Sequence, residues 1–511
     1  MTGNIKVSLK NGIIGLTSEI ANLIVQFVLR TITIKYVGVE ILGISETFSA
    51  ALNILNLAES GFQTAIIYYY YKPLRDGDET EINSLLNVLR VVYKIIGFLF
   101  IGISIIVMPF IGHLLNGVRI STSTYVIFFL LALNSASSYF LSYKRSLLYA
   151  SKREYVYKMI DMAVMVIVGL LSILLIMRYK NYILYLILRI SQTMISNIIV
   201  QYKCQKYYPF VRKEKINWSM LRKIMPDIKH LFVGSFAGYI YGCSDSLIIS
   251  TMIGTVNVAY LSNYAMITNQ LKRLINSFFS ISNSIIGNML LEDNNSQEYK
   301  KSFFAFITHI WFVAAIMAIV PIYVLIQGFI QVWVGPQYIL SNLVVILLLL
   351  DFFISIVQSP CGNFIISSGM FKMSKIADLT GALINIIISI ILVFKFGIEG
   401  VLVGTVISRV AQWGVRGTIA LRKCFSCNAK EQLTYWLKIV YQLLIIFIAS
   451  VLAKYICSKI IVDIYIYKFL ISFIISELIV VAFLLTCFWM FPEQVKLKHI
   501  LFSWIRKRFT I

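Results

Sequence analysis

Long apolar runs recur along this chain, and they constrain its fold more than any other feature. Examples are Val91–Leu115, Tyr125–Leu141, Phe303–Ile326 and Leu470–Met490. At about 1.5 Å of helix per residue, such runs are long enough to cross roughly 30 Å of hydrocarbon. Hydrophobic residues make up 59% of the chain and charged residues 14%, whereas about a quarter of a soluble domain is charged. The sequence therefore predicts an all-α polytopic membrane protein.

The apolar pattern predicts about fourteen transmembrane helices. They are expected at residues 11–35, 41–67, 91–115, 123–143, 156–177, 181–202, 229–253, 257–290, 303–329, 341–367, 375–394, 398–420, 435–457 and 466–490.

Lysine and arginine are divided unequally between the two sides of this arrangement. The even-numbered connections, with the adjoining span ends and both termini, hold 32 of these residues, and the odd-numbered connections hold eight. Basic residues favour the cytoplasmic side of short loops, so both termini are predicted to be cytoplasmic. The net charge of +23 is thereby explained by topology and by contact with anionic lipids, not by nucleic-acid binding.

The sequence contains an internal repeat. Gly38–Phe48 matches Gly254–Tyr264, and 147–155 matches 365–373 at nearly the same offset along the chain. Two matches at nearly one offset indicate a duplication of six helices. Because six is even, both copies have the same orientation, as in parallel-repeat transporters whose ligands bind near the midplane.

The duplication predicts two parallel six-helix lobes, related by an axis along the membrane normal, with two further helices. The predicted boundaries are 1–215 for the first lobe, 216–430 for the second, and 431–511 for the extra helices and a basic cytoplasmic tail. Rocking of one lobe against the other would give alternating access to a site between them.

Basic residues inside predicted spans are the candidate functional groups. The segment ITNQLKRLINS (267–277) places Lys272 and Arg273 in the middle of one span. A charge at mid-helix costs about 2.5–3.5 kcal/mol, so such residues face a cavity or a partner. Adjacent helical residues diverge by about 100°, so we expect one of them to extend toward the membrane surface or to pair, while the other faces the cavity. The remaining candidate cavity cations are Arg30, Arg189 and Arg409, whereas Arg416 is expected to extend to the cytoplasmic interface.

Two interpretations of these cations stay open at this point. In the first, they pair with acids inside the spans: Asp245 is expected to hold Lys272 or Arg273, and Glu46 and Asp351 are further charge-partner or ion-coupling candidates. In the second, arginine and lysine in a low-dielectric cavity form an anion site suited to phosphate or pyrophosphate.

The sequence shows no catalytic constellation. The four histidines are scattered, there is no glycine-rich nucleotide loop, and the lone Cys424/Cys427 pair has no further zinc ligands near it. We therefore expect neither an enzyme, nor a metal site, nor a bound cofactor. Transport would be coupled to H⁺, to Na⁺, to the membrane potential or to the substrate gradient.

Four stretches carry a resemblance to a known family: 36–62, 244–267, 332–339 and 367–405. With them, the chain resembles the Wzx-type polysaccharide exporters of the multidrug/oligosaccharidyl-lipid/polysaccharide (MOP) superfamily, which have a MATE-like fold. The resemblance implies a flippase in the bacterial plasma membrane for O-antigen or capsule units. It would move undecaprenyl-pyrophosphate-linked oligosaccharides outward through a central cationic cavity. It also implies anionic lipids, a glycan polymerase and glycosyltransferases as partners.

Three other functions are alternatives to a polysaccharide flippase. A MATE-like ion-coupled drug/cation antiporter would use acids, such as Glu46 and Asp245, in its cleft. A twelve-helix major-facilitator transporter would carry a Gly-x-x-x-Asp-Arg/Lys motif in the loop after its second helix, and residues 71–84 lack it. A membrane enzyme is not favoured, because the sequence shows no set of catalytic residues.

Overall fold

Helices are the only regular secondary structure in the described part of the chain. The computed structural model describes residues 2–55, 57–214, 218–291, 296–368, 370–460 and 464–490, and this part of the chain contains no strand. Ten of its helical segments are long and apolar enough to cross a membrane. The predicted all-α membrane class is confirmed.

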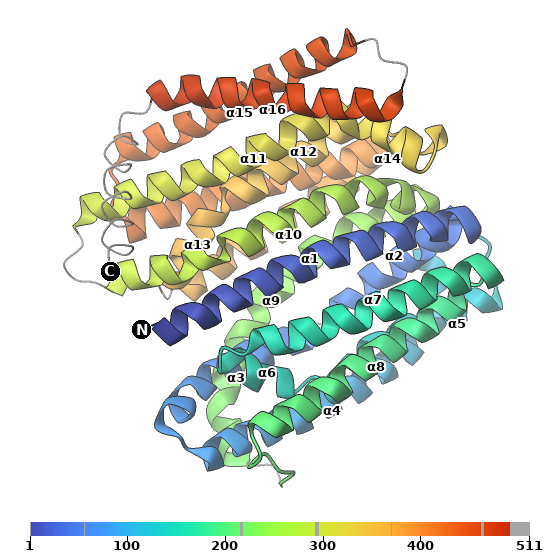
Figure 1. The fold of residues 1–511 in the computed structure, drawn as a ribbon, viewed down its shortest axis with the longest axis vertical. Helices are drawn as coiled ribbons and strands as arrows, with labels where there is room; N and C mark the ends of the chain where they lie inside the picture. Colours follow the sequence, from blue (N-terminus) through green and yellow to red (C-terminus); the bar gives the residue numbers. More distant parts are fainter. Residues whose placement is uncertain are drawn as a thin grey trace. The chain divides into compact units, whose positions relative to one another are not determined.

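The first of two compact units comprises residues Met1–Asn263 and Asn385–Val401. Its helices, drawn in blue to green in Figure 1, are α1 (Thr2–Tyr36), α2 (Val39–Leu55), α3 (Leu57–Asp76), α4 (Glu79–Val107), the 3₁₀ helix η1 (Met108–Leu114), α5 (Thr122–Leu141), α6 (Lys144–Ala150), α7 (Glu154–Tyr179), α8 (Tyr182–Tyr207) and α9 (Trp218–Met252).

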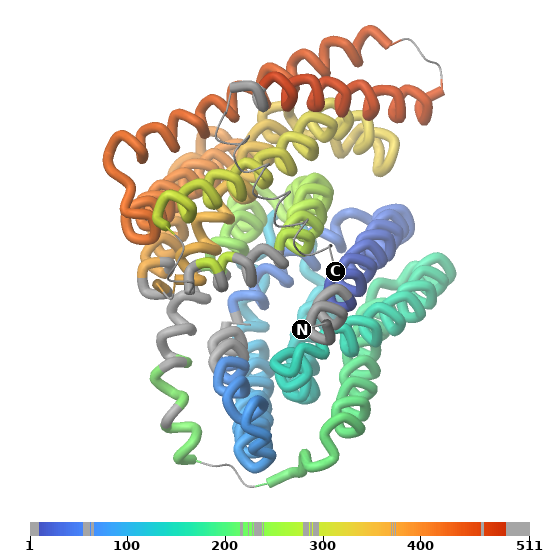
Figure 2. The backbone as a smooth tube through the Cα atoms, turned by 60° about the vertical axis from the view of Figure 1, so that its left-hand side comes forward, coloured from blue at the N-terminus to red at the C-terminus, as the bar shows by residue number. Residues whose placement is uncertain are grey.

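The second unit comprises Tyr264–Ile384 and Leu402–Ile511, so α10 and α14 contribute to both units. Its elements are α10 (Thr255–Leu291), α11 (Gln297–Trp333), the 3₁₀ helix η2 (Pro336–Tyr338), α12 (Asn342–Val357), α13 (Ser359–Ser367), α14 (Phe371–Ile419), the π-helical turn η3 (Ala420–Cys424), α15 (Ala429–Ser458) and α16 (Tyr465–Met490). Figure 2 shows α15 and α16, in orange and red, running side by side, and both pack on α11.

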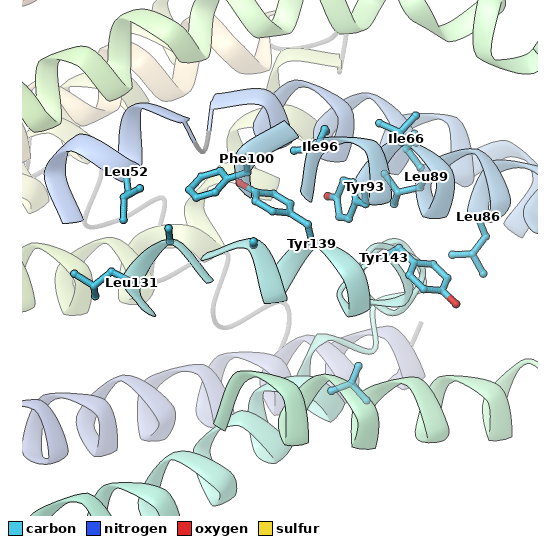
Figure 3. Packing of buried hydrophobic residues seen from close by; sticks show 14 of the residues in the cluster. Leu52, Ile66, Leu86, Leu89, Tyr93, Ile96, Phe100, Leu131, Tyr139 and Tyr143 are labelled. Carbon is cyan, nitrogen blue, oxygen red and sulfur yellow. The ribbon is translucent and has the colours of Figure 1, made fainter. Parts of the chain in front are cut away.

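A hydrophobic core joins the helices of the first unit. Tyr93, Phe100 and Tyr139 lie against one another between α4 and α5, and Phe48 of α2 meets Phe128 edge to face with ring centroids 5.1 Å apart. Figure 3 shows Tyr93, Phe100 and Tyr139 among the side chains of this core. Burial of about 150–250 Å² per aromatic side chain makes such residues a dominant stabilising contribution to a core.

The internal repeat is visible as a repeated turn. The backbone N–H of Gly38 donates to the carbonyl of Thr33 at 3.0 Å, and that of Gly254 donates to Ile249 at 2.9 Å. Both glycines have a positive φ, 112° and 149°, which only glycine adopts without strain. The helix ends before α2 and before α10, at matching positions of the two copies, are therefore closed in the same way.

Two further turns recur at nearly the same offset as the glycine turns. The N–H of Arg153 donates to the carbonyl of Leu148, and the N–H of Met370 donates to the carbonyl of Ile365. Lys180 closes α7 with a φ of 50°, and Gly397 has a φ of 57° inside α14. The turns at Arg153 and Met370 thus share a hydrogen-bond pattern, whereas Lys180 and Gly397 share a positive φ but differ in ψ, 31° and −131°.

The turn at Gly397 divides α14 into two antiparallel halves. The Ser389 hydroxyl donates to the carbonyl of Val401 at 3.1 Å, and a Cβ on Gly400 would collide with the backbone of Leu392. The predicted separation into spans 375–394 and 398–420 agrees with this hairpin.

All fourteen predicted spans coincide with helices, but three of them are not single α-helices. Span 41–67 comprises α2 and α3, span 91–115 comprises the end of α4 and η1, and span 341–367 comprises α12 and α13. Pro360 lies at the second position of α13, where it lacks an N–H to continue α12. Spans 41–67, 229–253 and 257–290 are not among the ten apolar segments, and Lys375–Cys424 covers two predicted spans, so the count of fourteen stays a prediction.

Several helices begin well before their apolar part. α4 starts at Glu79, ahead of the predicted span at 91–115, because the Asp78 carboxylate accepts the N–H of Glu81 at 2.9 Å. This bond lowers the pKa of Asp78. Hydropathy marks the part of a helix that lies in hydrocarbon, whereas capping residues mark where the helix starts.

The predicted lobe boundaries are not those of the compact units. Residues 215–217, where the first boundary was placed, and the tail from 491 to 511 lie outside the described residues. The division at 1–215, 216–430 and 431–511 therefore stays a prediction about the repeat.

Candidate functional site

One carboxylate in the second unit holds two cations from different helices. Lys272 Nζ of α10 lies 2.6 Å from Asp351 Oδ2 of α12, and Arg409 Nε of α14 donates to Asp351 Oδ1 at 2.8 Å. The three side chains are 16%, 23% and 15% exposed, for Lys272, Arg409 and Asp351 respectively. We name these residues the Asp351 cluster; its net charge is +1.

Lys272 and Arg273 have different environments, as their angular separation on α10 requires. Lys272 is held by Asp351 and approaches the ring of Phe352. Arg273 is exposed, and no carboxylate in the described part of the chain pairs with it. The carboxylate expected to hold one of them was Asp245; the one that contacts Lys272 is Asp351.

A second set of charged residues lies in the first unit, around Arg30 of α1. Arg30 Nη1 lies 3.0 Å from Glu46 Oε1 of α2, and its Nε donates to Asn263 Oδ1 of α10 at 2.7 Å. Its Nη2 also contacts the hydroxyl of Ser262. The side chain of Arg30 is 10% exposed, whereas that of Glu46 is 37% exposed. The carboxylate, not the guanidinium, is thus the accessible member of this pair.

Arg189 of α8 belongs to the same set. It is half-buried, and its charge interacts with Tyr185, Tyr182 and Glu46. The Tyr182 hydroxyl in turn donates to Ser45 at 2.8 Å. Arg30, Arg189 and Glu46 therefore also combine two cations with one carboxylate, and we name them the Glu46 cluster.

Sequence reasoning missed Asn263 and Ser262 as partners of Arg30. The repeat contained the signal, because Ser262 stands in the second copy where Glu46 stands in the first, at the same offset that relates Gly254 to Gly38. The equivalent positions of α2 and α10 thus both contact the same guanidinium.

Asp245 has polar neighbours on α9 and α14. Asn385 Nδ2 donates to Asp245 Oδ1 at 3.3 Å, and the Ser244 hydroxyl donates to Asn385 Oδ1 at 2.6 Å. Asp245 is half-buried. It belongs to an amide and hydroxyl network of the first unit.

Arg416 is paired with a carboxylate of the same hairpin. Its Nη2 contacts Asp378 Oδ1, and both side chains are 20% exposed. Gln412 Nε2 also donates to Asp378 at 2.9 Å. The expected extension of Arg416 to the cytoplasmic interface stays a prediction.

The described residues show no group of three histidine, cysteine or acidic side chains that could hold a metal ion. The chemistry of the two clusters is instead that of ion pairing. In a low-dielectric interior, arginine and lysine attract carboxylates and phosphates strongly.

Residues 8–282 match the family described as "Polysaccharide biosynthesis protein". The match covers more than half of the 511 residues. The chain belongs to this polysaccharide biosynthesis protein family. No curated protein matches it in sequence.

Solved structures share the fold of this family member. A structure of the "Lipid II flippase MurJ, inward closed conformation" aligns with a TM-score of 0.63 at 15% identity, covering 96% of this chain and 100% of that one. An inward-facing multidrug resistance MATE family transporter of the MOP superfamily aligns with a TM-score of 0.61 at 16% identity, covering 81% and 98%. A MOP superfamily transporter from Pyrococcus furiosus, titled for the reverse polarity of its binding pocket, aligns at 0.56 and 16%, covering 82% and 96%. The protein is thus a multi-pass membrane protein with a MurJ- and MATE-like fold.

Proposed function

We propose that this protein is a Wzx-type flippase. It would move undecaprenyl-pyrophosphate-linked oligosaccharide units from the cytoplasmic to the outer leaflet of the bacterial plasma membrane, by alternating access through a cationic cavity. The family supports a role in polysaccharide biosynthesis, and the likeness to a lipid II flippase supports a lipid-linked substrate.

The observation that carries the proposal is the charge of the Asp351 cluster and its neighbour on α10. Lys272 and Arg409 share a single carboxylate, and the exposed Arg273 follows directly. Such an excess of positive charge inside membrane helices is costly unless it serves a ligand. A diphosphate is the group of the substrate that this charge attracts most.

The proposal also includes an energy source, partners and an orientation in the membrane. Coupling to H⁺, Na⁺ or the membrane potential would supply the energy, with no bound cofactor. Anionic lipids, and assemblies with a glycan polymerase and glycosyltransferases, are the proposed partners. Both termini are proposed to lie in the cytoplasm, in line with the distribution of basic residues.

The test is the export of surface glycan by cells that depend on this protein. Replacing Lys272 and Arg273 with Gln removes two positive charges, while Arg409 still satisfies Asp351. We expect export to fall at least tenfold with the amount of protein in the membrane retained. The exchanges Lys272→Arg and Arg273→Lys should keep part of the activity. A well-expressed, fully active double Gln variant would contradict the proposal.

A MATE-like drug/cation antiporter is the second candidate, and one observation favours it. Glu46 is the accessible member of its ion pair with Arg30, and an accessible acid suits a cationic substrate. Extrusion of a fluorescent cationic dye that is lost in Glu46→Gln, with glycan export unaffected by the Lys272 and Arg273 changes, would favour the antiporter.

A further inference from the structure

Asp351 already forms ion pairs with the two cations that would bind the diphosphate of the proposed substrate. Lys272 Nζ and Arg409 Nε each contact one of its oxygens, at 2.6 and 2.8 Å. A diphosphate entering this cluster must therefore compete with the carboxylate. The competition has a physical use, because two unneutralised cations in a membrane interior would destabilise the empty protein.

We propose that Asp351 is an internal counter-ion that the diphosphate of the substrate displaces from Lys272 and Arg409, and that re-forms both contacts when the lipid leaves. The inference rests on the proposed function and assigns a role within it. Displacement lowers the affinity for the substrate and so permits release, since transport needs binding that is favourable but still reversible.

The geometry of the contacts suits displacement. Arg409 approaches Asp351 through Nε, and Lys272 through a single ammonium on a flexible stem. In the first unit, by contrast, Arg145 Nη1 and Nη2 contact both oxygens of Asp161 at 2.6 and 2.8 Å. Such a two-pronged pair has a fixed geometry and is the stronger form.

The net charge of the cluster predicts how its affinity for a diphosphate changes between variants. With Asp351 in place the cluster carries +1, and with the acid displaced, the two cations present +2 to the diphosphate. Affinity should therefore follow the net charge of the cluster. Asp351→Asn has +2, the wild type +1, the double variant Asp351→Asn with Lys272→Gln again +1, and Lys272→Gln alone has zero.

The experiment measures binding of farnesyl diphosphate to the purified full-length protein in lipid nanodiscs. Farnesol tests for the diphosphate, and inorganic pyrophosphate tests whether the lipid chain is needed. We expect Asp351→Asn to bind farnesyl diphosphate at least tenfold more tightly than the wild type. The double variant should resemble the wild type, and Lys272→Gln should bind at least tenfold more weakly. Export by Asp351→Asn should fall several-fold, because release is slowed.

Glu477→Gln is the matched control. Glu477 also lies in a membrane helix of the second unit, and its Oε2 is buried with no hydrogen-bond partner among the described residues. Its replacement should change neither binding nor export. If Asp351→Asn is too unstable to purify, the double variant is compared with Lys272→Gln. Both lack Lys272 and keep Arg409, so a difference in their affinity for farnesyl diphosphate reports the effect of Asp351 alone.

The outcomes separate the two proposals. If the wild type binds farnesyl diphosphate no better than farnesol, the proposed function fails. If the wild type prefers the diphosphate but Asp351→Asn binds it equally or more weakly, or the double variant binds no better than Lys272→Gln, only the counter-ion role is overturned. If inorganic pyrophosphate binds as tightly as farnesyl diphosphate, the cluster recognises the diphosphate and makes no contact that depends on the lipid chain.

Discussion

The two copies of the repeat share one paired carboxylate inside their helices, whereas a second carboxylate is present in only one copy. Asp161 of the first copy corresponds in the repeat to Asp378 of the second, and each pairs with an arginine. A polar side chain from the next helix also contacts each acid: Ser196 contacts Asp161, and its counterpart in the second copy, Gln412, contacts Asp378. A carboxylate that is paired in both copies is best explained by the needs of the fold.

The arginine, however, comes from a different helix in each copy. Arg145 of α6 serves Asp161, and the residue at the equivalent position of the second copy is Gly362 of α13. Arg416 of α14 serves Asp378, and its Nη1 is the atom nearest to a Cβ placed on Gly362, at 3.9 Å. The missing side chain leaves room for an arginine from another helix. The substitute is less well satisfied, because Arg416 Nε is buried with no hydrogen-bond partner in the described part of the chain.

The Asp351 cluster shows the opposite relation. At offsets of 217 and 216 residues, close to those of the repeat, we pair Asn134 and Thr193 of the first copy with Asp351 and Arg409 of the second. The Thr193 hydroxyl donates to Asn134 Oδ1 at 3.0 Å, so the first copy has a neutral hydrogen bond where the second has an ion pair. The second copy thus has charged side chains at positions where the first copy makes its contact without charge. This contrast supports a role for the Asp351 cluster in binding.

The largest expected effect comes from giving the second copy the neutral pair of the first. The triple variant Asp351→Asn, Arg409→Thr and Lys272→Gln removes every charge of the cluster and can form an Asn–Thr hydrogen bond. We expect glycan export to fall to background, while membrane abundance and thermal stability in detergent stay near those of the wild type. Loss of abundance in parallel with export would show that the comparison is wrong and the charges are structural.

The next largest effect concerns the carboxylate that both copies retain. Asp378→Asn leaves the partly buried Arg416 without its counter-ion. Breaking a fully buried pair costs about 3–5 kcal/mol, and solvent screening lowers that cost for a partly exposed one. We expect a marked decrease in thermal stability and abundance, and Asp161→Asn should act in the same direction on the first unit. Thermal denaturation of the purified variants gives the measurement. A stable but inactive Asp378→Asn protein would show that Asp378 serves transport and not folding.

A smaller effect is expected from moving the arginine of the second copy back to the position it has in the first. Gly362→Arg alone introduces an extra side chain beside Arg416 and should destabilise the protein by about 1–3 kcal/mol. Combining it with Arg416→Val, which places at 416 the residue found 216 positions earlier, Val200, removes the crowding and retains one arginine near Asp378. Recovery of thermal stability in the double variant would confirm the exchange, and additive losses would exclude it.

The smallest effect tests the turn that the copies share. Gly254→Ala places a Cβ at a φ of 149°, where it would also lie 3.2 Å from the Asn257 amide, and should cost about 1–2 kcal/mol. Gly12→Ala in α1 is the control, because a Cβ there meets no atom within 4 Å and its φ is helical. It should be neutral or slightly stabilising. Equal melting temperatures for the two variants would argue against a strained turn.

Much of this protein follows from the sequence alone. Runs of apolar residues located all fourteen predicted spans on helices, because a backbone in hydrocarbon must satisfy its own hydrogen bonds and the helix is the local way to do so. The match between Gly38 and Gly254 predicted the repeat, because a positive φ at a helix end restricts the position to glycine. Charge inside the spans also identified Lys272, Arg409 and Asp351 as candidates.

Only the tertiary structure decided which charges meet. Lys272, Asp351 and Arg409 come from α10, α12 and α14, and no local pattern states which faces of three helices converge. The same holds for Arg416, whose partner Asp378 lies on the other half of the hairpin at Gly397. Helix formation depends on residues within a few positions of each other, whereas ion pairs depend on packing between distant segments, and that packing is fixed only when the whole chain has folded.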